Sequence, residues 1–274
     1  MTTGTHKITR NLKARRKALL KKYDDEDLHQ LRVNIRRARA LLKPLSDPHC
    51  AALRREWGLL AQQTNAARDW DTLAIYAAQV LPPRDWQSLQ PLVEDYRERA
   101  RQRVLTTLQS DNWEATLGHW KKLVKQMGSD AFAEGTLVGG NRQAAKRVFK
   151  SSRKALARRD ERSWHKFRIA VKNLRYKLDN TSLEGDRELD DLKAIRKMCK
   201  RLQNALGDWH DTVVHHALLA EIANDPRLQN DPHASQALGG LATTIEASGR
   251  ESLLRVTTIL ERDKEILAAA VKSS

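Results

Sequence analysis

The sequence is poor in the residues that build disulfide frameworks, loops and membrane spans. Only two cysteines occur, Cys50 and Cys199, which excludes a disulfide scaffold and a four-cysteine zinc site. Glycine and proline are scarce, with 12 and 7 among 274 residues, which argues against a loop-rich β-sandwich and a collagen-like chain. No run of about 18 apolar residues occurs, so we expect no membrane span.

Acidic and aromatic residues are also in short supply. Asp and Glu number 34 against 50 Lys and Arg, which gives a formal charge of +16 and a pI of about 10.1. This excess predicts an anionic partner, such as nucleic acid, another polyphosphate or a membrane surface. Aromatic residues make up 5%, and the seven tryptophans are spread along the chain. We expect them in helix cores and groove walls, and not in a base-stacking platform.

The first 22 residues are basic and lack the apolar centre of a secretory signal peptide. A basic amphipathic start also occurs in transit peptides, but this one matches a later stretch of the chain. The low cysteine content is typical of a cytoplasmic protein. We therefore expect a cytoplasmic location.

Apolar residues recur three and four positions apart almost everywhere, which predicts an all-α fold. The breakers predict helices at about 5–22, 24–43, 49–67, 70–81, 84–109, 112–126, 141–158, 160–181, 186–205, 208–224 and 233–271, the last with a break near Gly239-Gly240 or Gly249. Residues 128–140 hold four of the 12 glycines and are the predicted linker. We expect a single domain, 1–274, in which this linker separates a first half, 1–127, from a second half, 141–274.

Two motifs occur once in each half. LHQLRVNIRRARALL at 28–42 matches WHKFRIAVKNLRYKL at 164–178, and NAARDWDT at 65–72 matches NALGDWHD at 204–211. The first match pairs His29 with His165, Arg32 with Arg168, Arg36 with Lys172, and Arg39 with Arg175. Two matches in the same order predict an internal duplication of a helical bundle.

The repeated helix carries a basic stripe beside its apolar face. Since each helical residue turns by about 100°, five basic side chains of the first copy fall within about 80°. They are His29, Arg32, Arg36, Arg39 and Lys43. The second copy repeats the stripe with His165, Arg168, Lys172 and Arg175. Neighbouring helices add further candidates to the predicted groove: Arg10, Lys17, Lys146, Arg153, Arg196 and Lys200.

Such a stripe favours anion binding, because clustered cations repel one another unless a polyanion lies between them. Arginine binds phosphate oxygens in bidentate fashion. A histidine among these cations should be neutral in the empty groove and should gain a proton as phosphate arrives. The alternative interpretation is a solvated, salt-bridged helix face.

The H-x-x-R-x-x-x-R/K-x-x-R helix, present twice, and NALGDWHD resemble the conserved histidine α-helical domain family, called CHAD. The resemblance covers about residues 6–270. It implies two pseudo-symmetric four-helix bundles and a basic central groove or pore that binds inorganic polyphosphate. It implies that the motif residues His29 to Arg39 and His165 to Arg175 bind this ligand. The chain departs from the pattern at Asn173 and Asp179, and NAARDWDT lacks the Leu-Gly pair.

No catalytic motif is found: no phosphate-binding glycine loop, nucleophile elbow or H-E-x-x-H helix occurs. The best metal-like cluster is Asp208, His210, Asp211, His215 and His216. The two aspartates at a predicted helix start favour capping, and the His210–His215 spacing of five does not suit one helix face. We therefore expect no enzyme activity, no cofactor and no bound metal.

Three functions remain open at this point. The first is non-catalytic polyphosphate binding, with recruitment to polyphosphate granules as a further expectation. The second is non-specific nucleic-acid binding, which shares the electrostatics. The third is an assembly protein that docks an acidic partner on a storage granule.

Overall fold

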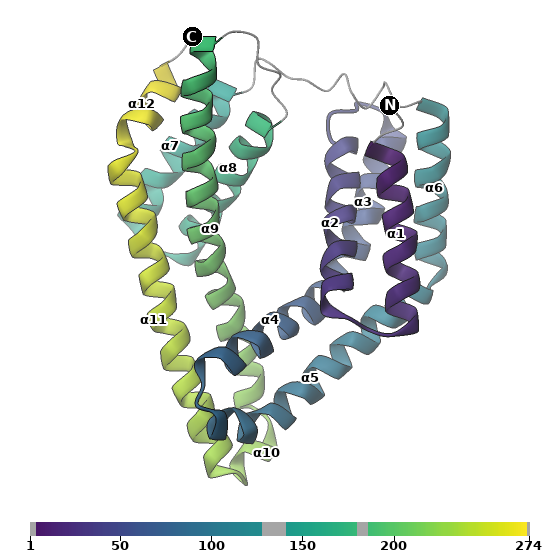
Figure 1. Cartoon of the computed structure of the whole chain (residues 1–274), viewed down its shortest axis with the longest axis vertical. Coiled ribbons are helices and arrows are strands. Elements are labelled where there is room, and N and C mark those ends of the chain that lie inside the picture. Colours follow the sequence, from purple (N-terminus) through teal and green to yellow (C-terminus); the bar gives the residue numbers. More distant parts are fainter. Residues whose placement is uncertain (1–3, 128–140, 180–185, 273–274) are drawn as a thin grey trace. The chain divides into compact units, whose positions relative to one another are not determined.

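The computed structural model describes residues 4–127, 141–179 and 186–272, and within these ranges it is helical with no strand. This confirms the predicted all-α class (Figure 1). The predicted linker, 128–140, lies outside the described residues. The helices in chain order are α1 (Gly4–Lys21), α2 (Asp25–Leu42), α3 (Pro48–Gln63), α4 (Asn65–Val80), α5 (Pro83–Gln109), α6 (Asp111–Met127), α7 (Asn141–Arg158), α8 (Glu161–Asp179), α9 (Asp186–Ala223), α10 (Pro226–Gln229), α11 (Pro232–Arg262) and α12 (Lys264–Lys272).

Aspartates and prolines start several of these helices. The Asp24 carboxylate accepts hydrogen bonds from the backbone N–H groups of Glu26 and Asp27, each at 3.0 Å. Asp47 caps α3, which begins with a proline whose missing N–H costs nothing in the first turn. These short signals explain why the starts of α2 and α3 follow the sequence prediction closely.

Three predicted helix boundaries are wrong. α9 continues through the predicted break at residues 206–207, so Asp208 and Asp211 lie inside a helix and do not cap one. α4 begins at Asn65, which also places Asp69 inside a helix. α11 passes both predicted glycine breaks and ends at Arg262. A helical glycine costs only about 1 kcal/mol, which the packing of flanking apolar residues such as Leu206 and Trp209 offsets.

The chain forms two compact units. The first comprises Met1–Gly135 and Ala220–Gly239, and the second comprises Thr136–Leu219 and Gly240–Ser274. α9 and α11 thus contribute residues to both units. The sequence patterns did not predict that residues 220–239 belong to the first unit. The division into duplicated halves, 1–127 and 141–274, stays a prediction.

In the first unit α1, α2, α3 and α6 pack side by side, and α4 pairs with α5 (Figure 1). Trp57 of α3 and Trp113 of α6 meet edge to face with ring centroids 5.6 Å apart. The Trp120 indole donates to the Thr9 hydroxyl at 2.8 Å, which ties α6 to α1. Buried aromatic pairs of this kind fix how the helices face one another.

The second unit has its own core, drawn from α7, α8, α9, α11 and α12. Phe167 and Val171 of α8 are fully buried there with Leu202 of α9. Cys199 is also fully buried in this core. Six of the seven tryptophans are buried and Trp86 is half-buried, as expected for core residues.

A buried carboxylate holds α4 against α5. Asp71 is fully buried and accepts hydrogen bonds from the Tyr23 hydroxyl at 2.8 Å and from Arg97 Nε and Nη2 at 3.1 Å each. Arg101 Nη2 lies 3.4 Å from Asp71 Oδ1, the oxygen that Arg97 also contacts. The Arg101 guanidinium carbon lies 4.8 Å from the centre of the Tyr23 ring. Burial and then Asp71 raise the pKa of the Tyr23 hydroxyl, so this residue stays a donor. Asp71 is therefore a structural residue.

Replacing Asp71 with asparagine should lower the free energy of unfolding by about 3 kcal/mol, because Arg97 and Arg101 lose their buried counter-ion and keep only more exposed partners such as Glu94. Chemical denaturation followed by circular dichroism measures this loss. Tyr23→Phe removes one neutral donor and should cost only about 1 kcal/mol. Equal losses in the two variants would contradict the central role of the Asp71 charge.

Candidate anion-binding site

The first cluster of charged residues lies in the first unit, on α2 and α4. α2 presents His29, Arg32 and Arg36 on successive turns, and α4 adds Arg68 and Asp69. Burial and then the charge of Arg68 lower the pKa of His29; Glu26 opposes this shift, and Arg36 and Arg32 add smaller effects that lower the pKa. The half-buried imidazole is therefore neutral at pH 7.

Arg32 has a structural bond as well as a place in the first cluster. Its Nη1 donates to the Ala61 carbonyl at 3.1 Å and to the Thr64 hydroxyl at 2.7 Å. Thr64 is fully buried where α3 meets α4, so Arg32 holds this junction. Burial lowers the pKa of Arg32, but a guanidinium remains charged in a protein.

Asp69 gives the first cluster an internal carboxylate. Its pKa is raised, because burial outweighs the opposing charges of Arg32 and Arg68. An incoming phosphate would have to share these two guanidinium groups with Asp69. The first cluster is thus a cationic site that already holds one negative charge.

The last two residues of the predicted α2 stripe, Arg39 and Lys43, do not belong to the first cluster. The Arg39 guanidinium packs against α3 so closely that a Cβ added at Gly58 would lie 3.3 Å from Nη2. Arg39 Nε is buried and has no hydrogen-bond partner among the described residues. Lys43 is exposed at the end of α2.

The second cluster lies in the second unit, on α8 and α9. The rings of His165 and His210 are 5.4 Å apart. Burial and then the charges of Arg168, His165 and Lys172 lower the pKa of His210 to about 4. Two imidazoles therefore meet beside two permanent cations, in a site where His210 is neutral at pH 7.

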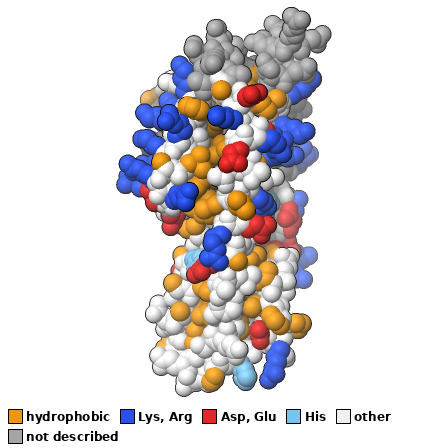
Figure 2. All heavy atoms as spheres, turned by 90° about the vertical axis from the view of Figure 1, so that its left-hand side faces the viewer, with side chains coloured by type: hydrophobic (Ala, Val, Ile, Leu, Met, Phe, Trp, Pro, Cys, Tyr) orange, Lys and Arg blue, Asp and Glu red, His pale blue; other side chains and the backbone are white. Residues whose placement is uncertain are grey.

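The remaining predicted residues of the second unit divide into bonded and exposed side chains. Arg175 donates to the Gln203 side-chain oxygen at 3.0 Å. Arg196 donates to the Leu178 carbonyl and so caps the end of α8. Lys146, Lys200 and Arg153 are exposed, the last 6.0 Å from the centre of the Phe149 ring. On the face drawn in Figure 2, Lys and Arg side chains flank a strip of hydrophobic ones, and most lie in its upper half.

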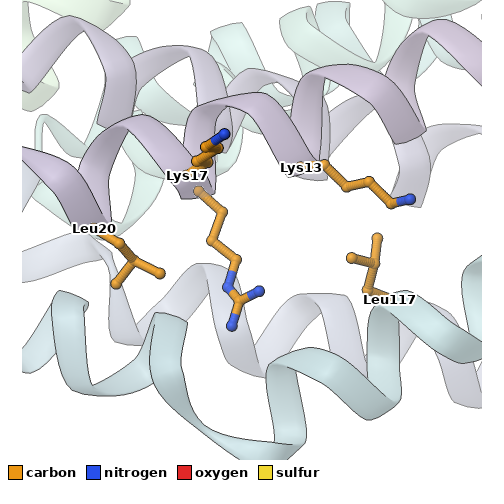
Figure 3. Close-up of a pocket in the computed structure, with 5 residues that line it drawn as sticks. Lys13, Lys17, Leu20 and Leu117 are labelled. Atoms are coloured by element: carbon orange, nitrogen blue, oxygen red, sulfur yellow. The ribbon is translucent and has the colours of Figure 1, made fainter.

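Two basic residues of α1, Arg10 and Lys17, were predicted to line the groove but do not join the first cluster. α1 contacts α2 through Asn11, which donates to Asn34 at 3.4 Å, and through Arg15, which pairs with Asp27 at 2.5 Å. Lys17 lies two residues beyond Arg15, about 200° round the helix, and lines a pocket with Leu117 of α6 (Figure 3). The Arg10 side chain is exposed.

Sequence reasoning missed Arg68 and did not assign His210 to anion binding. Both lie in the downstream motif that occurs once in each half, Arg68 in NAARDWDT and His210 in NALGDWHD. A signal was therefore present in the recurrence of that motif. It could not show which helix the motif faces.

The described residues contain neither a candidate metal site nor a candidate membrane span. No three His, Cys, Asp or Glu side chains there come close enough together to hold a metal ion. None of the helices in those ranges combines the length and apolar character needed to cross a bilayer.

Comparisons with known proteins agree with the architecture. The crystal structure of the CHAD domain from the plant Ricinus communis is similar over 97% of this chain and 89% of that chain, with a TM-score of 0.69 and 24% sequence identity. No curated protein matched the sequence. The family model of the CHAD domain matches residues 5–220, which include both copies of the basic helix. The chain therefore belongs to the CHAD domain family.

Proposed function

We propose that this protein binds inorganic polyphosphate without catalysis, through the first and second clusters. The observation that carries the proposal is the same in each unit: an imidazole lies partly buried among Arg and Lys side chains, and burial together with these charges lowers its pKa. Such a site is unfavourable when empty and is relieved by a polyanion. Family membership supports the same ligand class.

The form of the clusters favours a narrow, flexible chain of phosphates. His29, Arg32 and Arg168 are half-buried, so a ligand must reach between helices to touch them. A thin inorganic chain can do this more readily than a stiff DNA duplex, whose phosphates lie on a wide cylinder. Exposed cations such as Lys146 and Lys200 would then steer the ligand by long-range attraction. A cytoplasmic location with recruitment to polyphosphate granules is part of this proposal.

Competition binding tests the proposal. Long-chain polyphosphate should displace labelled duplex DNA from the full chain at a lower phosphate concentration than DNA displaces labelled polyphosphate. Affinity should fall steeply with salt, since each phosphate contact releases bound cations. If DNA competes equally well at equal phosphate concentration, the protein is a general nucleic-acid binder and the proposal fails. Unchanged polyphosphate chain length after prolonged incubation would agree with the absence of catalysis.

A further inference from the structure

A separate pocket lies between α1 and α6 in the first unit (Figure 3). Its volume is about 310 Å³, which is enough for a small organic ligand. The pocket is lined by Lys13, Arg16, Lys17, Leu20 and Leu117. The α1 residues among these lie on the side of the helix that faces away from the contacts with α2, so the pocket is not part of the first cluster.

The pocket is positively charged. Among the described residues, neither Lys13 nor Lys17 has a carboxylate within ion-pair distance. Lys121 of α6 lies beside Lys13: burial and then the Lys13 ammonium lower the pKa of Lys121, while Glu114 opposes them. Lys13 and Lys17 therefore line the pocket on α1, and the Lys121 ammonium of α6 lies close to that of Lys13.

The two other charged groups at this pocket are already paired with each other. Arg16 Nε donates to the Leu108 carbonyl at 2.7 Å, and Arg16 Nη1 pairs with Glu114 at 2.5 Å. Arg16 therefore fixes α1 against the end of α5 and against α6. Glu114 acts on Lys121 while it is paired with Arg16, but it forms no ion pair with Lys13 or Lys17.

The pocket also has an apolar wall. Leu117 is buried, whereas Leu20 keeps 36% of its surface exposed. Figure 3 shows Lys13 and Leu117 at one end of the pocket and Leu20 at the other. Leucine surface gains nothing from a bare phosphate chain, but it is stabilised by contact with an apolar or aromatic group.

We propose that the α1–α6 pocket is a binding site for a small organic phosphate. Its phosphoryl group would contact Lys13 and Lys17, and its apolar or aromatic body would contact Leu20 and Leu117. The site is independent of the polyphosphate clusters on α2, α4, α8 and α9, and does not rest on their function.

Fluorescence titration of the full chain with a methylanthraniloyl derivative of ATP tests this site. The double variant Lys13→Gln, Lys17→Gln should weaken binding of this probe by about tenfold or more, because two charge-assisted contacts are lost. Leu20→Ser should weaken the nucleotide several-fold and leave the affinity for inorganic tripolyphosphate unchanged. Both lysines are exposed, so helix content should stay the same.

Two controls separate this site from general electrostatics and from the proposed function. Lys7→Gln, Lys22→Gln removes the same charge outside the pocket and should leave probe binding intact. The cluster variant, in which Arg36, Arg68, Arg168 and Lys172 are all replaced with glutamine, should also bind the probe as the unaltered protein does. Wild-type binding by the pocket variant would overturn the proposal, as would loss of probe binding in the cluster variant. An equal effect of Leu20→Ser on nucleotide and tripolyphosphate would overturn the choice of an organic ligand.

Discussion

Replacing Arg36, Arg68, Arg168 and Lys172 together with glutamine should lower the affinity for long-chain polyphosphate by more than a thousandfold. Each charge-assisted hydrogen bond contributes about 1.5–3 kcal/mol net, so four of them approach 6 kcal/mol even at the lower value. The salt dependence of binding should become shallower at the same time, because fewer cations are released. Equilibrium titration at two or more salt concentrations measures both effects.

The choice of residues spares one arginine with a known structural bond. Arg32 is left in place because its bonds to Ala61 and Thr64 hold the junction of α3 and α4. A matched control removes the same charge from exposed positions, with Arg103, Lys122, Lys154 and Arg250 changed to glutamine. If the control loses as much affinity as the cluster variant, binding depends on net charge and not on the clusters.

Polyphosphate affinity should rise about tenfold or more between pH 7.5 and pH 5.5. His210 has a pKa of about 4 without ligand, and an adjacent phosphate should raise this pKa to the ordinary value of about 6.5 or above. The ligand-bound form then takes up a proton that the free form does not, so binding is favoured as pH falls. His29, whose pKa is also lowered, acts in the same direction.

The histidines can be tested separately from the rest of the charge. His210→Gln should flatten most of this pH dependence while keeping a neutral hydrogen-bonding side chain beside His165. Long chains are the ligand to use, since their inner phosphates keep one charge each throughout this range. An affinity that is constant from pH 7.5 to pH 5.5 in the unaltered protein would rule out a proton-coupled role for these imidazoles.

Much of the fold follows from local sequence signals. The caps Asp24 and Asp47 and the first-turn prolines Pro48, Pro226 and Pro232 carry the physical reason for a helix to start where it does. Two of the three wrong boundaries, in α9 and α11, fall where a glycine resembles a break but the helix continues through it. Gly207 is the clearest case, because Leu206 and Trp209 both pack into the core of the second unit. Tertiary packing decided these positions, and a single sequence does not display it.

The candidate site was predictable in its residue types and less so in its partners. The spacing of His29, Arg32 and Arg36 places them on one face of a helix whatever the helix packs against. Which neighbour covers that face depends on how each helix is rotated in its bundle. For this reason the sequence could not show that Arg68 approaches His29, or that Lys17 faces α6 and not α2.

The first unit is built from two segments of the chain that are separated by part of the second unit, and this has a consequence for folding during synthesis on the ribosome. Residues 220–239 belong to the first unit but follow Thr136–Leu219 of the second. A nascent chain therefore cannot complete its first unit before most of the second has emerged. In the described structure, Asp225 accepts a hydrogen bond from Tyr96, and Arg227 pairs with Asp95 at 2.8 Å, so this late segment makes real bonds to α5. Whereas many proteins fold one domain after another in the order of synthesis, the first unit of this chain should reach its native state only once residues 220–239 have emerged.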